Sequence, residues 1–256
     1  CWDYADLADM LDWDALNDFR RKSLNPEHPA QRGTAQNPDV FFQAKEASNK
    51  AYDAIPEVVE EYMNKVNEKI GSDYKLFNYY GAEDADEVII AMGSVCDTIS
   101  ETVDYLNANG RKVGLVKVRL YRPFSVKHLV AAIPSTVKKI SVLDRTKEPG
   151  SIGEPLYLDV VAALRDTEFA NVPVYTGRYG LGSKDTTPAQ IIAVFKNTEK
   201  KRFTIGINDD VTNLSLALDE NPDTTPAGIT SCKFWGLGAD GTVGANKNSV
   251  KIIGDH

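Results

Sequence analysis

The stretch Val88–Asn109, VIIAMGSVCDTISETVDYLNAN, decides the fold of this chain. Its first five residues, Val88–Met92, are almost continuously apolar, as expected of a strand that is buried on both faces of a sheet. Gly93-Ser94 then predicts a turn. The apolar residues that follow recur at spacings of three and four, which places them on one face of a helix: Ile99, Val103 and Leu106.

A second strand follows this helix. Asn109-Gly110 predicts the helix end, because glycine readily takes the left-handed backbone that closes a helix. Val113–Leu120 is the next apolar run, so the chain contains a strand–helix–strand unit and therefore a parallel sheet with packed helices. The same patterns predict strands at 139–144, 172–176 and 203–207, and helices at 126–133, 156–164 and 188–195.

The residues before the last of these helices predict its start. Thr187 is expected to be the N-cap, Pro188 the first helical residue, and Gln190 the partner of Thr187 in a capping box. Patterns alone therefore indicate an α/β domain, without saying what it does.

Composition excludes several classes of protein. The 256 residues are 42% hydrophobic and 26% charged, which is typical of a globular chain. The net charge of -8 argues against non-specific binding to nucleic acid or to a membrane surface. The three cysteines are far apart, which indicates a reducing, cytoplasmic compartment and no self-contained zinc or iron–sulfur site. No metal-binding residue and no catalytic residue is predicted.

The first part of the chain is expected to be helical up to about Tyr80. Pro56 is expected to begin one of its helices, where the missing N–H does no harm. Asp12 or Asp14 is expected to cap another helix. An aromatic and aliphatic stripe in the first twenty residues must pack against another surface.

Four segments follow from these patterns: a helical arm at 1–83, an α/β domain at 84–200, a linker at 201–231, and the truncated start of a further unit at 232–256. The chain begins with Cys1 and stops just after an apolar periodic segment. It is therefore expected to be an excised piece of a longer polypeptide.

The last segment carries the strongest candidate for a binding site. Phe234 is expected to end a strand, and Gly236-x-Gly238-x-x-Gly241 runs from it into a helix. Glycines let a backbone approach a ligand closely, and a helix N-terminus favours an anion. Lys247 and Lys251 share one face of that helix. By itself the spacing leaves two interpretations open, a phosphate or nucleotide site and a tight structural turn.

Two further loops carry charge. In Gly177–Asp185, Arg178 and Lys184 could bind an anion, although a loop at an interdomain surface is the favoured interpretation. In Asp144–Pro155, Asp144-Arg145 with Glu148 and Glu154 could form a carboxylate pair for acid–base chemistry, although salt-bridged loop charges are more common. His128 is expected to be solvated or at an interface.

Several longer blocks resemble a known family. These are RGTAQNPDVFFQAKEA, YYGAEDADEVIIAMGS, LYRPFS, SVLDRTKEPGSIGEPLYLDV, TGRYGLGSKDTTPAQ and CKFWGLGADGTVGANKNSVKIIGD. Together they are similar to pyruvate:ferredoxin (flavodoxin) oxidoreductases over nearly the whole chain. The resemblance implies a three-layer α/β sandwich with a mainly parallel sheet, similar to the C-terminal domain of transketolase. The helical arm would come from the preceding thiamine-type domain.

The resemblance also implies a function. Such enzymes convert pyruvate and coenzyme A into acetyl-CoA and carbon dioxide, and reduce ferredoxin or flavodoxin. They use thiamine diphosphate, Mg²⁺ and [4Fe–4S] clusters, and the whole enzyme is expected to be a homodimer. The coenzyme A loop would correspond here to five residues: Gly238, Ala239, Asp240, Gly241 and Thr242.

The resemblance places the rest of the site outside this chain. Pyruvate contacts would precede Cys1, whereas the thiamine diphosphate site and the cluster cysteines would follow His256. The chain alone is thus expected to be inactive, to hold no cofactor, and to serve as a scaffold among the other domains. Two alternatives remain: a related enzyme acting on another 2-oxoacid, and a noncatalytic interaction module.

Overall fold

The computed structural model describes residues 2–30, 33, 35–208, 211–226, 228–236, 238 and 241–255. The chain forms two compact units, Cys1–Pro222 and Asp223–His256, and each is described here by itself. Within the described residues, every helix is too short or too polar to cross a bilayer.

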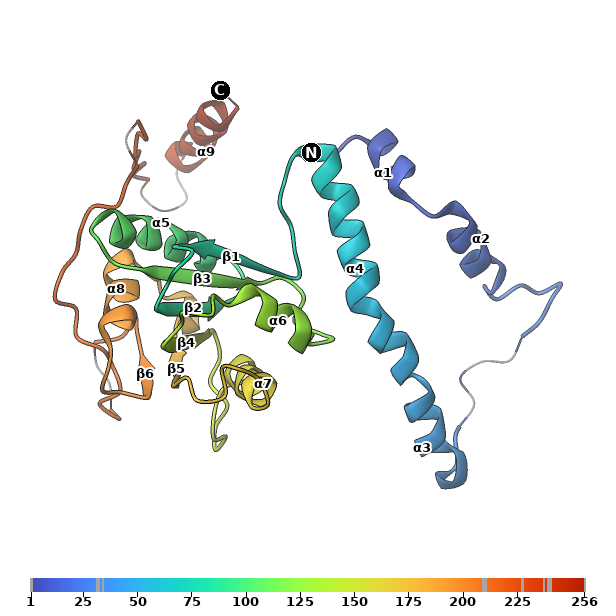
Figure 1. The fold of residues 1–256 in the computed structure, drawn as a ribbon. Coiled ribbons are helices and arrows are strands. Elements are labelled where there is room, and N and C mark those ends of the chain that lie inside the picture. The colour runs from blue at the N-terminus through green and yellow to red at the C-terminus, as the bar shows by residue number, and fades with distance from the viewer. Residues whose placement is uncertain are drawn as a thin grey trace. The chain divides into compact units, whose positions relative to one another are not determined.

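A six-stranded sheet organises the first unit (Figure 1). Its strands lie in the order β1-β3-β2-β4-β5-β6, and β2 to β6 are parallel, whereas β1 is antiparallel to β3. The strand bounds are β1 Phe77–Gly81, β2 Glu87–Ala91, β3 Val113–Val118, β4 Lys139–Asp144, β5 Val174–Arg178 and β6 Arg202–Thr204. A mainly parallel α/β sheet is therefore confirmed.

The stretch that decides the fold forms the predicted strand–helix–strand unit. Strand β2 is buried from Val88 to Ala91, and helix α5, Val95–Ala108, returns the chain to β3. Gly93 (φ 82°) makes the turn before the helix, and Gly110 (φ 84°) follows its end. Both glycines have the positive φ that their predicted turns require.

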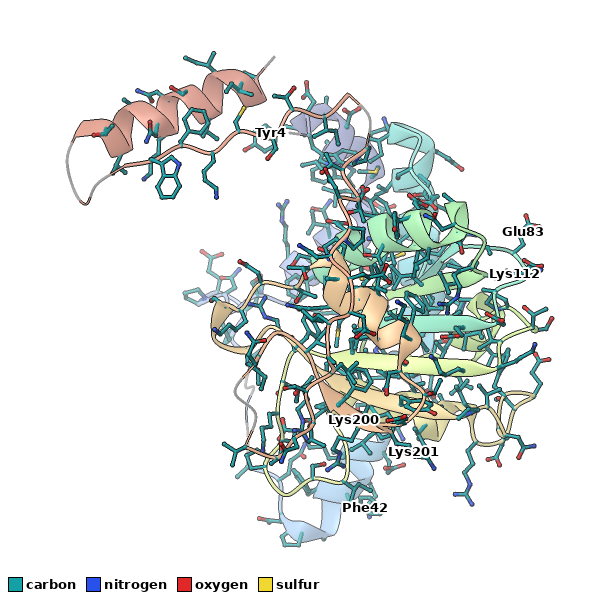
Figure 2. All side chains as sticks on the ribbon, turned by 90° about the vertical axis from the view of Figure 1, so that its left-hand side faces the viewer. Tyr4, Phe42, Glu83, Lys112, Lys200 and Lys201 are labelled. Atoms are coloured by element: carbon teal, nitrogen blue, oxygen red, sulfur yellow. The ribbon has the colours of Figure 1, made fainter. Side chains whose placement is uncertain are left out.

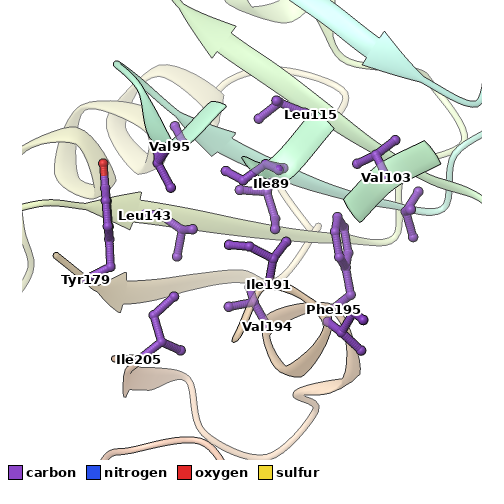
Figure 3. Packing of buried hydrophobic residues seen from close by; sticks show 14 of the residues in the cluster. Ile89, Val95, Val103, Leu115, Leu143, Tyr179, Ile191, Val194, Phe195 and Ile205 are labelled. Carbon is purple, nitrogen blue, oxygen red and sulfur yellow. The ribbon is translucent and has the colours of Figure 1, made fainter. Parts of the chain in front are cut away.

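Helices cover both faces of the sheet and complete three layers (Figure 1). Helix α5 and helix α8, Pro188–Lys196, pack on one face, where Ile99, Ile191 and Phe195 are fully or almost fully buried. Figure 3 shows this cluster closing around Ile89 from β2 and Leu143 from β4. Helices α6, Val126–Ala132, and α7, Pro155–Leu164, cover the opposite face.

Strand β1 corrects the expectation that the chain stays helical up to about Tyr80. Phe77 is buried and pairs with Val118 of β3, and Gly81 pairs with Gly114. The buried neighbour Leu76 accepts backbone hydrogen bonds from the residues after β3. Pairing with a segment more than thirty residues away, rather than local propensity, thus sets the conformation of this stretch.

The arm before the sheet consists of four helices: α1 Tyr4–Met10, α2 Trp13–Arg21, α3 Pro38–Ala47 and α4 Asn49–Ile70. Asp12 caps α2 by accepting a hydrogen bond from the Ala15 N–H, as predicted. Pro56 does not begin a helix, because α4 starts at Asn49 and continues through it. The proline removes one N–H donor, and the good helix formers around it keep the other bonds in place.

Much of the arm's apolar surface is exposed. Phe42 and Tyr4 are 70% and 88% exposed (Figure 2). Helix α4 nevertheless contacts the sheet domain, because Val59 and Met63 pack on its core. His128 of α6 lies at this contact, with Nε2 3.5 Å from a carboxylate oxygen of Glu60 and Nδ1 2.6 Å from the Ser125 hydroxyl.

The start of α8 differs in one detail from the prediction. Thr187 is the N-cap residue and Pro188 is the first helical residue, but the Thr187 side chain makes no capping hydrogen bond. The backbone carbonyl of Thr187 instead accepts from the Gln190 N–H, and Gln190 Oε1 is buried without a hydrogen-bond partner among the described residues. The prediction of a capping box is therefore wrong.

The chain beyond β6 returns alongside that strand. Lys200 donates hydrogen bonds from Nζ to the main-chain oxygens of Asn213 (2.8 Å) and Ser215 (2.7 Å), and Figure 2 labels it at this edge of the molecule. The returning segment thereby covers part of the outer edge of β6, which limits pairing with another strand there.

Candidate functional site

The glycine-rich segment of the second unit leads into a 14-residue helix, α9, Gly241–Gly254. Gly238 has φ 61°, which side chains rarely allow, and a Cβ there would meet no described atom within 4 Å. The backbone is thus open on that side. The strand expected to end at Phe234 is absent from the described residues, because 229–236 have no strand to pair with.

A short contact folds this segment against α9. Asn246 donates a hydrogen bond from Nδ2 to the carbonyl oxygen of Trp235 at 2.9 Å. A Cβ on Gly236 would lie 3.3 Å from Val243 and 3.4 Å from Asn246, which is tighter than side chains normally tolerate. A side chain at position 236 would therefore require Val243 or Asn246 to shift by a few tenths of an ångström.

Three of the five predicted coenzyme A residues are described by the structure. Gly238 lies in the loop, and Gly241 and Thr242 form the first turn of α9. Ala239 and Asp240 lie outside the described residues. Lys247 and Lys251 are exposed and four residues apart on α9. A glycine-rich backbone at a helix N-terminus suits an anion, whereas Lys251 lies in the last turn of α9.

A second cluster of charges lies at the carboxyl edge of the parallel strands. Asp144, the last residue of β4, is 3% exposed and accepts hydrogen bonds from the N–H groups of Leu156 (2.9 Å) and Tyr157 (3.1 Å). Its carboxylate therefore binds the N-terminus of α7. Burial raises the pKa of Asp144, and the two N–H groups oppose that rise.

Glu154 connects two loops at this edge. It is 3% exposed, lies 2.6 Å from Arg178 Nε, and accepts a hydrogen bond from the Glu148 N–H at 2.7 Å. Asp144 and Glu154, two of the three carboxylates considered for acid–base chemistry, are thus engaged with structural partners. The structure confirms the favoured interpretation, in which these charges are paired within the loops.

The charge of Arg178 is thus paired with the Glu154 carboxylate, whereas Lys184 is exposed. Sequence reasoning missed the neighbouring Tyr179, which is 8% exposed. No spacing rule singles out a tyrosine that follows a strand. In the described part of the chain, no three His, Cys, Asp or Glu side chains lie together in a way that could hold a metal ion.

Comparisons with known proteins give matches to two family models. The model described as "Pyruvate:ferredoxin oxidoreductase core domain II" matches residues 85–191. The model described as "Pyruvate flavodoxin/ferredoxin oxidoreductase, thiamine diP-bdg" matches residues 3–64. The first match covers the sheet domain from the loop before β2 to α8, and the second covers the helical arm.

Individual relatives match almost the whole chain. The pyruvate-flavodoxin oxidoreductase of Enterobacter agglomerans is 60% identical over 99% of this chain and 22% of its own length. The pyruvate:ferredoxin oxidoreductase of Moorella thermoacetica is 57% identical over the same shares. The solved 2-oxoglutarate:ferredoxin oxidoreductase of Magnetococcus marinus aligns with 54% of this chain and 22% of that chain, at 25% identity and a TM-score of 0.36.

The chain thus spans about a fifth of the length of the curated relatives it matches. The two family models match successive parts of it, and the two relatives match almost all of it. This chain therefore belongs to the pyruvate:ferredoxin/flavodoxin oxidoreductase family.

Proposed function

We propose that the chain is a segment of an enzyme that oxidatively decarboxylates pyruvate with coenzyme A, yielding acetyl-CoA and carbon dioxide and reducing ferredoxin or flavodoxin. Identities of 60% and 57% to relatives whose names state this activity support the proposal. Within that enzyme the sheet domain is a scaffold between other domains. We propose the segments 1–83, 84–200, 201–231 and 232–256 as its divisions, and a homodimer as its assembly.

The cofactors of the whole enzyme are proposed to be thiamine diphosphate, Mg²⁺ and [4Fe–4S] clusters, held by parts of the enzyme other than this chain. Among the described residues of α1 to α4, the only fully buried one is Pro56, so no buried polar pocket there fits thiamine diphosphate. Cys96 is buried and Cys232 is exposed in the other unit, an arrangement that does not fit a cluster.

The part of the site that this chain supplies is proposed to be the coenzyme A loop, Gly238–Thr242. The observation that carries this proposal is the open, positive-φ backbone at Gly238 directly before α9. Coenzyme A carries several phosphate groups, and a glycine-rich backbone at a helix N-terminus suits one of them. Lys247 and Lys251 add positive charge on the same helix, so binding should weaken as salt rises.

Steady-state kinetics of the full-length enzyme test this role. Thr242→Val and Asp240→Ala change the loop, and Ser249→Ala is the matched control, because its hydroxyl bonds only to Ala245 O within α9. We expect the coenzyme A KM to rise about tenfold in the loop variants, with an unchanged pyruvate KM. Loop variants that behave like Ser249→Ala would mean that the loop is only a turn.

Two alternatives are tested in the same preparation. A related enzyme for another 2-oxoacid would turn over that acid faster than pyruvate, which a substrate panel measures directly. A noncatalytic module would show no turnover with any 2-oxoacid. The electron acceptor needs its own assay, because the flavodoxin-named and ferredoxin-named relatives are almost equally similar to this chain.

A further inference from the structure

A cavity of about 380 Å³ opens at the carboxyl edge of the sheet, between the ends of β2 and β4. From β2 the chain crosses to β3 on one side, and from β3 it crosses back to β4 on the other side of β2. The cavity therefore lies where the strand order reverses. In open α/β sheets, this is where the loops diverge and leave a crevice for a ligand.

Hydrogen-bond donors from three separate loops line this cavity. Ser94 occupies the N-cap position of α5, yet its hydroxyl makes no capping hydrogen bond. Arg145 follows β4 and donates from Nε to the carbonyl oxygen of Gly180 at 2.9 Å. That bond fixes the guanidinium, while its two terminal nitrogens have no partner among the described residues. A guanidinium held in this way can still bind an oxyanion through two parallel bonds.

Tyr179 provides the third donor in the cavity wall. More than nine-tenths of this residue is buried, it lines the cavity, and its hydroxyl has no hydrogen-bond partner in the described part of the chain. Figure 3 shows its oxygen pointing away from Ile205, toward the side on which Val95 lies. Burial raises the pKa of Tyr179 to about 12, so at neutral pH the hydroxyl remains a donor. The hydroxyl can therefore donate to a ligand in the cavity.

The charges around the cavity have both signs. Asp144 also lines the cavity, but two N–H groups of α7 already bind its carboxylate oxygens. The N-terminus of α5, a helix of 14 residues, contributes further partial positive charge. The cavity wall also includes Met92, Leu143 and Pro155, which suit an apolar or planar group beside the anion.

We propose that this cavity binds a phosphate monoester of mononucleotide size, with Arg145, Ser94 and Tyr179 as donors to the phosphate and the apolar wall beside the organic part. A phosphate has enough acceptor oxygens for all three side chains. The volume lies at the lower end of the range for small-molecule sites, which excludes a dinucleotide. This proposal does not depend on the coenzyme A loop, which belongs to the other unit.

Calorimetric titration of the 256-residue chain tests the proposal, with 5′-AMP, inorganic phosphate and adenosine as probes. We expect 5′-AMP to bind with a Kd of roughly 10–1000 μM, phosphate to bind more weakly, and adenosine not to bind measurably. Arg145→Gln should weaken 5′-AMP binding about tenfold or more, and Tyr179→Phe should weaken it several-fold. Arg165→Gln, an exposed arginine after α7, is the control and should bind like the parent.

Thermal unfolding of each variant separates lost binding from lost folding. Tyr179→Phe removes only a hydroxyl that makes no internal bond, so its unfolding midpoint should match that of the parent. Absence of 5′-AMP binding at about 10 mM would overturn the proposal. Equal affinities of Arg145→Gln, Tyr179→Phe and Arg165→Gln would also overturn it, because the ligand would then lie elsewhere.

Discussion

Lys139→Met should destabilise the sheet domain strongly, because Lys139 joins three elements at the amino edge. The residue begins β4 and is 8% exposed. Its Nζ donates hydrogen bonds to the main-chain oxygens of Phe195 (2.5 Å) and Asn197 (3.1 Å), at the end of α8. The same nitrogen lies 2.5 Å from a carboxylate oxygen of Glu87, at the start of β2. One ammonium group therefore holds β4, β2 and the C-terminus of α8.

The expected loss is about 3–6 kcal/mol. Each hydrogen bond from a charged donor is worth roughly 1.5–3 kcal/mol, and the variant loses two of them. Loss of the ion pair adds less than for a fully buried pair, because the Glu87 side chain is 22% exposed and keeps Arg111 at 3.1 Å. Methionine retains most of the apolar stem, which limits the packing loss.

Urea unfolding followed by far-UV circular dichroism measures this loss, since the three tryptophans lie at positions 2, 13 and 235, outside the sheet. Lys138→Met is the matched control: the adjacent residue is exposed, and its substitution should cost less than about 0.5 kcal/mol. Adding Glu87→Gln to Lys139→Met should recover about 1 kcal/mol, because it removes the carboxylate left behind. Equal losses for Lys138→Met and Lys139→Met would refute the reasoning.

Three further perturbations address other parts of the chain. Burial raises the pKa of Asp144 above its ordinary 3.8, so the folded state takes up this proton more readily than the unfolded chain. The stability of the parent relative to Asp144→Asn should therefore grow as pH falls through the folded pKa toward 3.8, and a pH-independent difference in urea titrations would contradict this. The Asn67 side chain accepts a hydrogen bond from the Tyr74 N–H (2.7 Å) and donates one to the Tyr74 carbonyl oxygen (2.9 Å), which holds the backbone next to Lys75. Asn67→Ala should therefore speed tryptic cleavage after Lys75 several-fold. The control Asn64→Ala, at an exposed position, should leave the cleavage rate unchanged. Helices α5 and α9 both have 14 residues, but α5 buries six of them and α9 buries none. The backbone amides of α9 should therefore exchange hydrogen at least about tenfold faster than those of α5. Similar protection of the two helices would contradict this prediction.

Local signals were sufficient to predict the centre of the fold. The apolar run at Val88, the helical spacing that follows it and Gly110 each act over a few residues, and all three predictions are confirmed. Strand β1 could not be predicted in this way. Its residues FNYYG follow a long helix, and only pairing with Val113–Val118 makes them a strand. The prediction that Pro56 begins a helix was wrong because helix α4 continues through this proline. Here a strong local signal was overridden by the residues on both sides of it.

The two candidate sites also differ in how far local sequence could predict them. The glycine-rich segment is contiguous, so its loop and helix can be read from spacing alone, although its ligand cannot. The donors of the phosphate cavity come from loops after β2, β4 and β5, and Arg145 lies 51 residues from Ser94 in the numbering. Only the crossing of the chain at β2 brings these loops together, and no one-dimensional pattern reports that crossing.

The reversed direction of β1 decides how the sheet domain is connected to the rest of the chain. Because β1 is antiparallel to its neighbour, its first residue, Phe77, lies level with the end of β3. The polypeptide therefore enters the first strand and leaves the last one at the same rim, five strand spacings or about 24 Å apart. The opposite rim carries short connections between consecutive elements and, beside Lys200, the segment that returns after β6. The strands β1 to β6 could therefore be exchanged between relatives by cutting the chain at one rim, before Phe77 and after Thr204.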